Sequence, residues 1–152
     1  MAPQSPPVRP ARENDSAALR RLQSHLSEPS PTLLSTAIAE LSDSIPIRTS
    51  RLLVSPDSDD RPVGYLLAVG EGPIHIAELA VDPDHRRERR ATALLNKICD
   101  NTTHAVTVHV AAENEPARSL YRRVGFVEAE RSPELFEDSE GITLRYPSFK
   151  SE

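Results

Sequence analysis

The spacing of apolar residues predicts that the chain opens with a short strand and two helices. Val8–Ala11 suits an edge strand, because Pro10 cannot donate a hydrogen bond to a central ladder. The polar residues 14–16 suit a helix N-terminus, and leucines recur after them at helical spacing in a helix that ends near Pro29. Pro31 fits the first turn of a second helix. The apolar face of that helix consists of Leu33, Leu34, Ala37, Ile38 and Leu41.

The pattern then changes to extended segments. Runs of apolar, β-prone residues occupy Arg51–Val54, Pro62–Val69 and Ile74–Val81. The polar segments between them, Ser55–Arg61 and Gly70–Gly72, have the composition of turns. Three consecutive strands joined by short turns predict an antiparallel meander.

The second half of the chain alternates helices with strands. Arg90–Asp100 and the segment from Pro116 to Val124 carry apolar residues at helical spacing. Between them, Ala105–Ala111 alternates as a half-buried strand does. Phe126–Arg131 and Ile142–Tyr146 predict a closing hairpin around a loop at residues 132–141.

This order of elements predicts a fold of the α/β (α+β) class. It gives about seven strands and about four helices, and the step from strand 74–81 through a helix to strand 105–111 requires a parallel pair. The remaining strands are joined by hairpins. We therefore expect a twisted mixed sheet flanked by helices.

Length and composition narrow the class of protein. A chain of 152 residues fits one domain, and we expect it at residues 8–148 after a flexible lead-in at residues 1–7. With 38% hydrophobic and 27% charged residues, the composition is that of a globular protein. No apolar run is long enough to span a membrane and no secretory signal opens the chain, so we expect a cytoplasmic protein.

Cysteine and histidine content gives no indication of a metal. The one cysteine, Cys99, excludes a disulfide framework and suits a buried helix face. His75, His85, His104 and His109 are scattered, without the spacing of a metal site, so structural or solvent-facing roles are expected.

The charge distribution contains one local exception. The net charge is -5, which weighs against a nucleic-acid-binding protein, yet the six residues His85–Arg90 contain four arginines. This cluster lies between a predicted strand and a helix N-terminus, where unpaired N–H groups and guanidinium forks favour a phosphate. The alternative is a solvated loop whose arginines pair with Asp82, Asp84 and Glu88.

A second segment, Asn114–Phe126, is explained without any ligand. Asn114 can cap the helix, Leu120 and Tyr121 can pack in the core, and Gly125 can end the helix.

Together, however, the two segments resemble the GNAT family of N-acetyltransferases. The first matches the family's phosphate-loop motif and the second matches its later motif, in the family's order. The matching residues are Val81, Pro83, Arg86, Ala91, Leu94 and Leu95, and then Asn114, Ala117, Leu120, Tyr121, Gly125 and Phe126. The start of the chain, Val8–Pro10 and the two helices, also looks like the start of the family's fold. Acceptor pockets in the family come from the first two helices and the closing hairpin, so the resemblance implies an acceptor site bordered by Ser24–Leu41 and Arg131–Gly141.

The resemblance implies a site. Acetyl-CoA would bind where the sheet opens between strands 74–81 and 105–111. The main chain of Leu79, Ala80 and Val81 would hold the pantetheine arm and the thioester, and the loop would hold the pyrophosphate. The loop residues implied are Arg86, Arg87, Glu88, Arg89, Arg90 and Ala91.

The resemblance also implies roles for three side chains. Tyr121 would protonate the departing CoA thiolate, with core packing as its alternative role. Glu78 would take the proton of the amine, and otherwise it would face the open side of the sheet. Asn114 would cap its helix and contact the cofactor.

One residue departs from the motif. Arg89 stands where the family has the first glycine of the phosphate loop, and it either crowds the pyrophosphate or adds a contact to it. A domain that senses acyl-CoA or binds a partner without catalysis is therefore an alternative to the transferase. We expect acetyl-CoA and an amine acceptor as partners, no metal, nucleic acid or membrane, and a monomer or homodimer.

Overall fold

The computed structural model describes residues 5–42, 49–136 and 139–147, and they form a seven-stranded mixed sheet with four α-helices. This confirms the predicted fold class. The strands are β1 (Arg9–Pro10), β2 (Ser50–Pro56), β3 (Pro62–Val69), β4 (Ile74–Val81), β5 (Val106–Ala111), β6 (Val127–Phe136) and β7 (Ser139–Tyr146). The helices are α1 (Ser16–Gln23), α2 (Pro31–Ala39), α3 (Arg90–Asp100) and α4 (Glu115–Val124).

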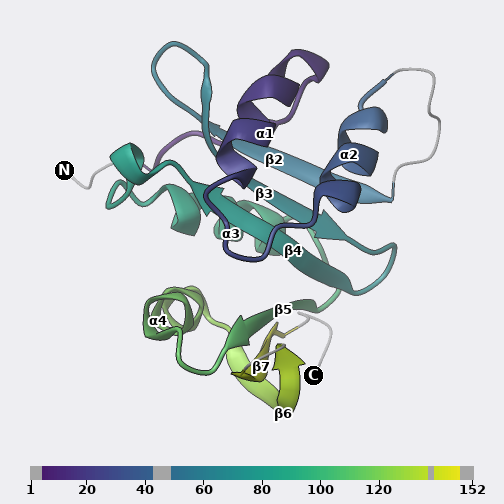
Figure 1. The fold of residues 1–152 in the computed structure, drawn as a ribbon, viewed down its shortest axis with the longest axis vertical. Helices are drawn as coiled ribbons and strands as arrows, with labels where there is room; N and C mark the ends of the chain where they lie inside the picture. Colours follow the sequence, from purple (N-terminus) through teal and green to yellow (C-terminus); the bar gives the residue numbers. More distant parts are fainter. Residues whose placement is uncertain (1–4, 43–48, 137–138, 148–152) are drawn as a thin grey trace.

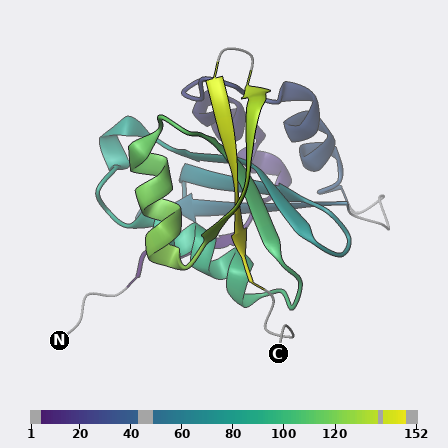
Figure 2. The same cartoon turned by 90° about the horizontal axis from the view of Figure 1, so that it is seen from below.

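The sheet order is β1-β2-β3-β4-β5-β7-β6, with helices on both faces (Figure 1). Leucines of α1 and α2 pack with Tyr65 and Leu67 on one face, and leucines of α3 pack with valines of β5 on the other. The two pairs of helices lie on opposite sides of the sheet (Figure 2). Burial of these apolar faces, rather than helix propensity, stabilises the short helices.

A bulge interrupts the pairing of β3 with β4. Leu67 pairs with Glu78 and Ala68 pairs with Ile76, so Ala77 has no partner across the ladder. An extra residue reverses the side-chain alternation of a strand. Ile76 therefore packs on the α3 side of the sheet, whereas Glu78 is turned to the α1 side.

β4 and β5 pair over a short length only. Their parallel register runs from Ile74–Val106 to Ile76–Val108 and stops there. The C-terminal half of β4 then separates from the end of β5 (Figure 1). The sheet is therefore open between Leu79 and Ala111, as the resemblance implied.

Two predictions about element boundaries are wrong. The first helix ends at Gln23 and not near Pro29, because its last turn tightens into i→i−3 bonds from Ser24, His25 and Leu26. Residues 132–136 and 139–141 belong to β6 and β7 and not to a loop, while residues 137–138 lie outside the described part of the chain. β6 is an edge strand, where Pro133 and two register shifts are tolerated.

One cap also differs from expectation. Asp15 precedes α1 but makes no side-chain cap bond; it accepts from Arg9 and from the Arg12 N–H, both at 2.8 Å. The division into a lead-in at residues 1–7 and a domain at residues 8–148 stays a prediction. None of the helices that the structure describes is long and apolar enough to cross a bilayer.

Candidate functional site

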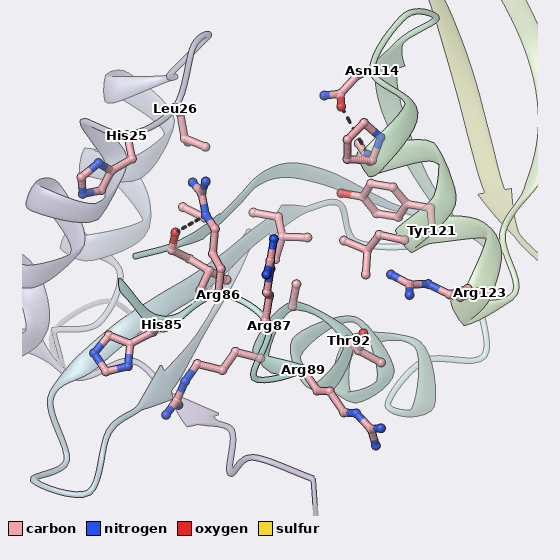
Figure 3. Close-up of a pocket in the computed structure, with 18 residues that line it drawn as sticks. His25, Leu26, His85, Arg86, Arg87, Arg89, Thr92, Asn114, Tyr121 and Arg123 are labelled. Carbon is pink, nitrogen blue, oxygen red and sulfur yellow. Dashed lines mark hydrogen bonds between the residues drawn. The ribbon is translucent and has the colours of Figure 1, made fainter. Parts of the chain in front are cut away.

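A cleft of about 710 Å³ lies at the C-terminal end of β4, where the sheet opens (Figure 3). Its walls come from four places: the end of β4, the loop before α3, the first turns of α4, and the connection between α1 and α2. Ten of the twelve predicted site residues line it, namely Leu79, Ala80, Val81, Arg86, Arg87, Arg89, Arg90, Ala91, Asn114 and Tyr121.

The end of β4 presents main-chain groups to the opening. Asp82 donates its N–H to the Val63 carbonyl at 2.8 Å, so alternate residues of β4 bond to β3. The N–H and C=O groups of Leu79 and Val81 therefore point away from β3, toward the opening, where the Val81 carbonyl accepts from Arg86 Nε at 3.4 Å. Here β5 has already separated from β4, so a ligand can take the place of the missing strand.

The loop before α3 has the geometry of an anion site. Arg87 and Arg89 have φ angles of 65° and 63°, in the left-handed region that non-glycine residues seldom adopt. Arg89 is the N-cap of α3, so the unpaired N–H groups of the first helical turn follow it directly. A glycine-type turn before a helix N-terminus is an arrangement that binds phosphate.

The arginine cluster divides into two parts. Arg86, Arg87 and Arg89 line the cleft. Arg90 also borders it, but its guanidinium donates to the Ser55 hydroxyl at 3.0 Å, to the Pro56 carbonyl at 2.9 Å and to Glu88 at 2.7 Å. Arg90 therefore ties the loop to the end of β2.

Glu88 is outside the cleft lining. It contacts Arg90 and His85, and the hydrogen bond from Arg90 holds its pKa below the usual value. The alternative interpretation of the arginine cluster, a solvated and ion-paired loop, thus applies to this part of it.

Tyr121 and Asn114 reach the cleft from α4. The Tyr121 ring is 5% exposed and packs edge-on against Phe126, while its hydroxyl points into the cleft (Figure 3). Burial raises the pKa of Tyr121, which keeps the phenol protonated as a proton donor. The Asn114 side chain caps α4 by accepting from the Ala117 N–H at 3.3 Å. Tyr121 and Asn114 therefore have the structural roles predicted for them, core packing and helix capping, and they also line the cleft.

A sequence model of the Acetyltransferase (GNAT) family matches residues 19–126, which include every part of this cleft. The chain belongs to the GNAT acetyltransferase family. Within the family, two mycothiol acetyltransferases, from Clavibacter sepedonicus and Clavibacter michiganensis, are each 35% identical to it over 83 residues. That match covers 51% of this chain but 27% of each relative, so the chain spans about a quarter of their length.

Solved GNAT structures share the fold at low identity. Arabidopsis thaliana NAA60 with acetyl-CoA has a TM-score of 0.76 at 18% identity, covering 92% of this chain and 97% of that one. The ribosomal-protein-S18-alanine N-acetyltransferase of Escherichia coli has a TM-score of 0.77 at 18% identity, covering 93% of both chains. A spermidine N-acetyltransferase variant from Vibrio cholerae has a TM-score of 0.73 at 20% identity, covering 91% of both chains.

Glu78 does not lie where a GNAT base was expected. It is 4% exposed, is absent from the cleft lining, and faces the α1 side of the sheet. Its carboxylate accepts from Gln23, from the Ser30 N–H and from the Tyr65 hydroxyl. The base role stays a prediction, and these contacts favour a different role for the side chain.

Several cleft residues of this GNAT domain were not predicted one by one. His25 and Leu26 come from the connection after α1, inside the segment 24–41 that was expected only as a whole to border the acceptor, and they approach from the side opposite α4 (Figure 3). Thr92 comes three residues after Arg89 and Arg123 three residues after Leu120, so the i, i+3 spacing of a helix face would have found them.

Of the cysteine and the four histidines singled out from the sequence, His85 lines the cleft, whereas Cys99, His75 and His109 do not. Cys99 is buried in the core as expected, and burial raises the pKa of its thiol to about 12. His75 and His109 pack ring against ring at 4.5 Å on β4 and β5. Burial and the neighbouring His109 lower the pKa of His75.

Proposed function

We propose that the chain transfers an acetyl group from acetyl-CoA directly to a primary amine. The observation that carries the proposal is the meeting of three features in one cleft. They are the free main-chain edge of β4, the arginine-bearing N-terminus of α3 and the Tyr121 hydroxyl. Each supplies a different part of what acyl transfer from a phosphate-bearing thioester needs.

The loop before α3 would hold the CoA pyrophosphate. Its left-handed residues aim main-chain N–H groups toward one concave site, and the helix N-terminus adds a partial positive charge. Arg86, Arg87 and Arg89 line the cleft beside that site and add positive charge to it. A bound pyrophosphate would accept several charge-assisted hydrogen bonds there.

The free edge of β4 would hold the pantetheine arm and polarise the thioester carbonyl. Leu79 and Val81 offer N–H and C=O groups in the alternation that an amide-containing arm matches. An N–H group aimed at the carbonyl oxygen stabilises the negative charge that forms when the amine attacks.

In the transfer step, the amine nitrogen bonds to the carbonyl carbon and the carbon–sulfur bond breaks. The electron pair leaves on sulfur, and the Tyr121 hydroxyl gives its proton to the thiolate as it forms. The attacking nitrogen releases one proton to water, and a proton from water restores the Tyr121 phenol, so the products are an acetylated amine and the free thiol of CoA.

The comparisons support the donor more than any one acceptor. The relatives are acetyltransferases of mycothiol, and the similar solved structures include acetyltransferases of a ribosomal-protein alanine and of spermidine. The acceptor therefore stays open between a small molecule and a protein amine. Cytoplasmic location, absence of a nucleic-acid partner and a monomeric or homodimeric state stay predictions.

Calorimetric titration with acetyl-CoA, followed by a panel of amines with a free-thiol readout, tests the proposal. We expect saturable binding, thermal stabilisation by the cofactor, and thiol release with at least one amine. Binding without thiol release on any amine would favour the alternative, a non-catalytic acyl-CoA-sensing module. No binding and no stabilisation at millimolar acetyl-CoA would refute both the transferase and the acyl-CoA sensor, and would favour an interaction module that does not use the cofactor.

A further inference from the structure

The carboxylate of Glu78 is fully occupied by hydrogen-bond donors. Its Oε1 accepts from the Tyr65 hydroxyl at 2.8 Å, and its Oε2 accepts from the Ser30 N–H at 2.6 Å. The Gln23 amide donates to both oxygens, at 3.1 and 3.0 Å. A carboxylate offers about four acceptor positions, and four contacts use them.

Two of these donors, Gln23 and Ser30, flank the segment that forms one wall of the cleft. Gln23 is the last residue of α1 and Ser30 directly precedes α2. The six residues between them, 24–29, include His25 and Leu26, which line the cleft on the side opposite α4. One side chain on β4 thus holds both ends of this connection.

The connection has few other bonds. The N–H groups of Ser24, His25 and Leu26 bond back to the last turn of α1. Within the described parts of the chain, residues 27–29 make no hydrogen bond or ion pair. The path of the connection into α2 therefore depends on the contact between Ser30 and Glu78.

We infer that Glu78 is a positioning residue that fixes the 24–29 connection as the acceptor-side wall of the cleft, and is not the acceptor of the amine proton. A proton acceptor needs a free lone pair within reach of the amine. Glu78 has its acceptor positions occupied, is 4% exposed and does not line the cleft. The kinetic predictions of this inference rest on the proposed function. Its structural predictions rest on the hydrogen bonds of Glu78 alone.

Two substitutions of the same residue separate the roles. Gln in place of Glu78 keeps the shape, and the Gln23 amide and the Tyr65 hydroxyl can turn to remake their bonds with it. Glu78→Ala removes the acceptor for all three donors. If Glu78 is a base, Glu78→Gln and Glu78→Ala both abolish that role. If Glu78 is a positioning residue, Glu78→Gln largely keeps the role and Glu78→Ala removes it.

For a positioning role, we expect Glu78→Gln to keep kcat within about threefold of wild type. Glu78→Ala should raise the KM for the acceptor about tenfold or more, while the Kd for acetyl-CoA stays within about twofold. The pH profile of kcat in Glu78→Gln should keep its wild-type shape. Glu71→Gln, in the exposed turn at the opposite end of β4, is the matched control.

Hydrogen exchange tests the same inference without any activity. Peptides that cover residues 24–30 should exchange faster in Glu78→Ala and in the partner variant Gln23→Ala, and at the wild-type rate in Glu71→Gln. A loss of about 100-fold in kcat in both Glu78 variants, with unchanged exchange at residues 24–30, would establish the base role and overturn the inference. If the wild type transfers no acetyl group, the exchange and acetyl-CoA-binding results still decide the positioning role.

Discussion

The substitution Arg89→Gly separates the backbone of the phosphate loop from its side chain. Arg89 has φ 63° and ψ 22°, a conformation that costs an L-residue about 1–2 kcal/mol and costs glycine nothing. Glycine also gains freedom in the unfolded chain, worth about 0.4–1 kcal/mol. The net expectation is a stabilisation of about 0.5–1 kcal/mol, or about 1–4 °C in Tm for a chain of this size.

The same substitution should weaken the binding of acetyl-CoA. Because the backbone already has a glycine-type conformation, the loop keeps its shape and only the guanidinium is lost. Arg89 lines the cleft, and among the described residues its side chain has no carboxylate partner to neutralise it. One partly exposed contact to a phosphate is worth about 0.5–1.4 kcal/mol, which gives a Kd about 2- to 10-fold higher.

Arg89→Ala is the matched control, because it removes the guanidinium but keeps the left-handed strain. We expect the same loss of acetyl-CoA affinity as in the glycine variant, without the gain in Tm. Urea denaturation and calorimetric titration measure the two quantities separately. Tighter binding in Arg89→Gly would show that the side chain crowds the pyrophosphate, and equal stability of the two variants would refute the argument from strain.

Three further substitutions test other parts of the site. Tyr121→Phe should lower kcat while leaving the Kd for acetyl-CoA nearly unchanged, and an equal loss in both would assign Tyr121 to packing alone. Arg90→Ala should lower the free energy of unfolding in urea by about 1–3 kcal/mol, since it breaks the bonds that tie the loop to the end of β2. The lowered pKa of His75 means that the unfolded chain binds a proton more readily than the folded one, so stability is lost as the pH falls through about 6.5. His75→Gln should reduce that slope between pH 7 and pH 5, and an unchanged slope would contradict the assignment.

The strongly periodic elements of this fold follow from the sequence. α3 has the predicted boundaries, because Leu94, Leu95 and Ile98 repeat at helical spacing after a loop rich in charge. β5 alternates valines that all reach the core. The predicted strands of the closing hairpin were shorter than the observed ones. Residues 132–141 include edge-strand pairing with no clear apolar alternation, so the sequence did not mark them as strand.

The residues of the candidate site also divide into those that the sequence predicts and those that it does not. Loop and α4 residues were found from their motifs, and the structure brings them into one cleft. The place of Glu78 was not found, since no local pattern tells which partner a carboxylate meets across the fold. The pairing of Glu88 with Arg90 follows the alternative interpretation of the arginine cluster, the ion-paired loop. The β4 bulge did leave one trace in the sequence. On the α3 side of the sheet, Ile74 and Ile76 are followed by Leu79, so the interval of two becomes three at the bulge.

That one extra residue explains why the two sides of the site are coupled. Without the bulge, with Ala77 paired in a regular ladder, the alternation of β4 would turn the Glu78 carboxylate toward the α3 side and the main-chain N–H of Leu79 toward β3. With it, the free edge of β4 faces the opening, while Glu78 reaches Gln23 and Ser30 on the opposite face. The bulge that would offer main-chain groups to the thioester therefore also places the side chain that holds the acceptor-side wall. A change that removes the bulge should disturb both sides of the site, whereas Glu78→Ala, which leaves the bulge in place, should disturb the acceptor side alone.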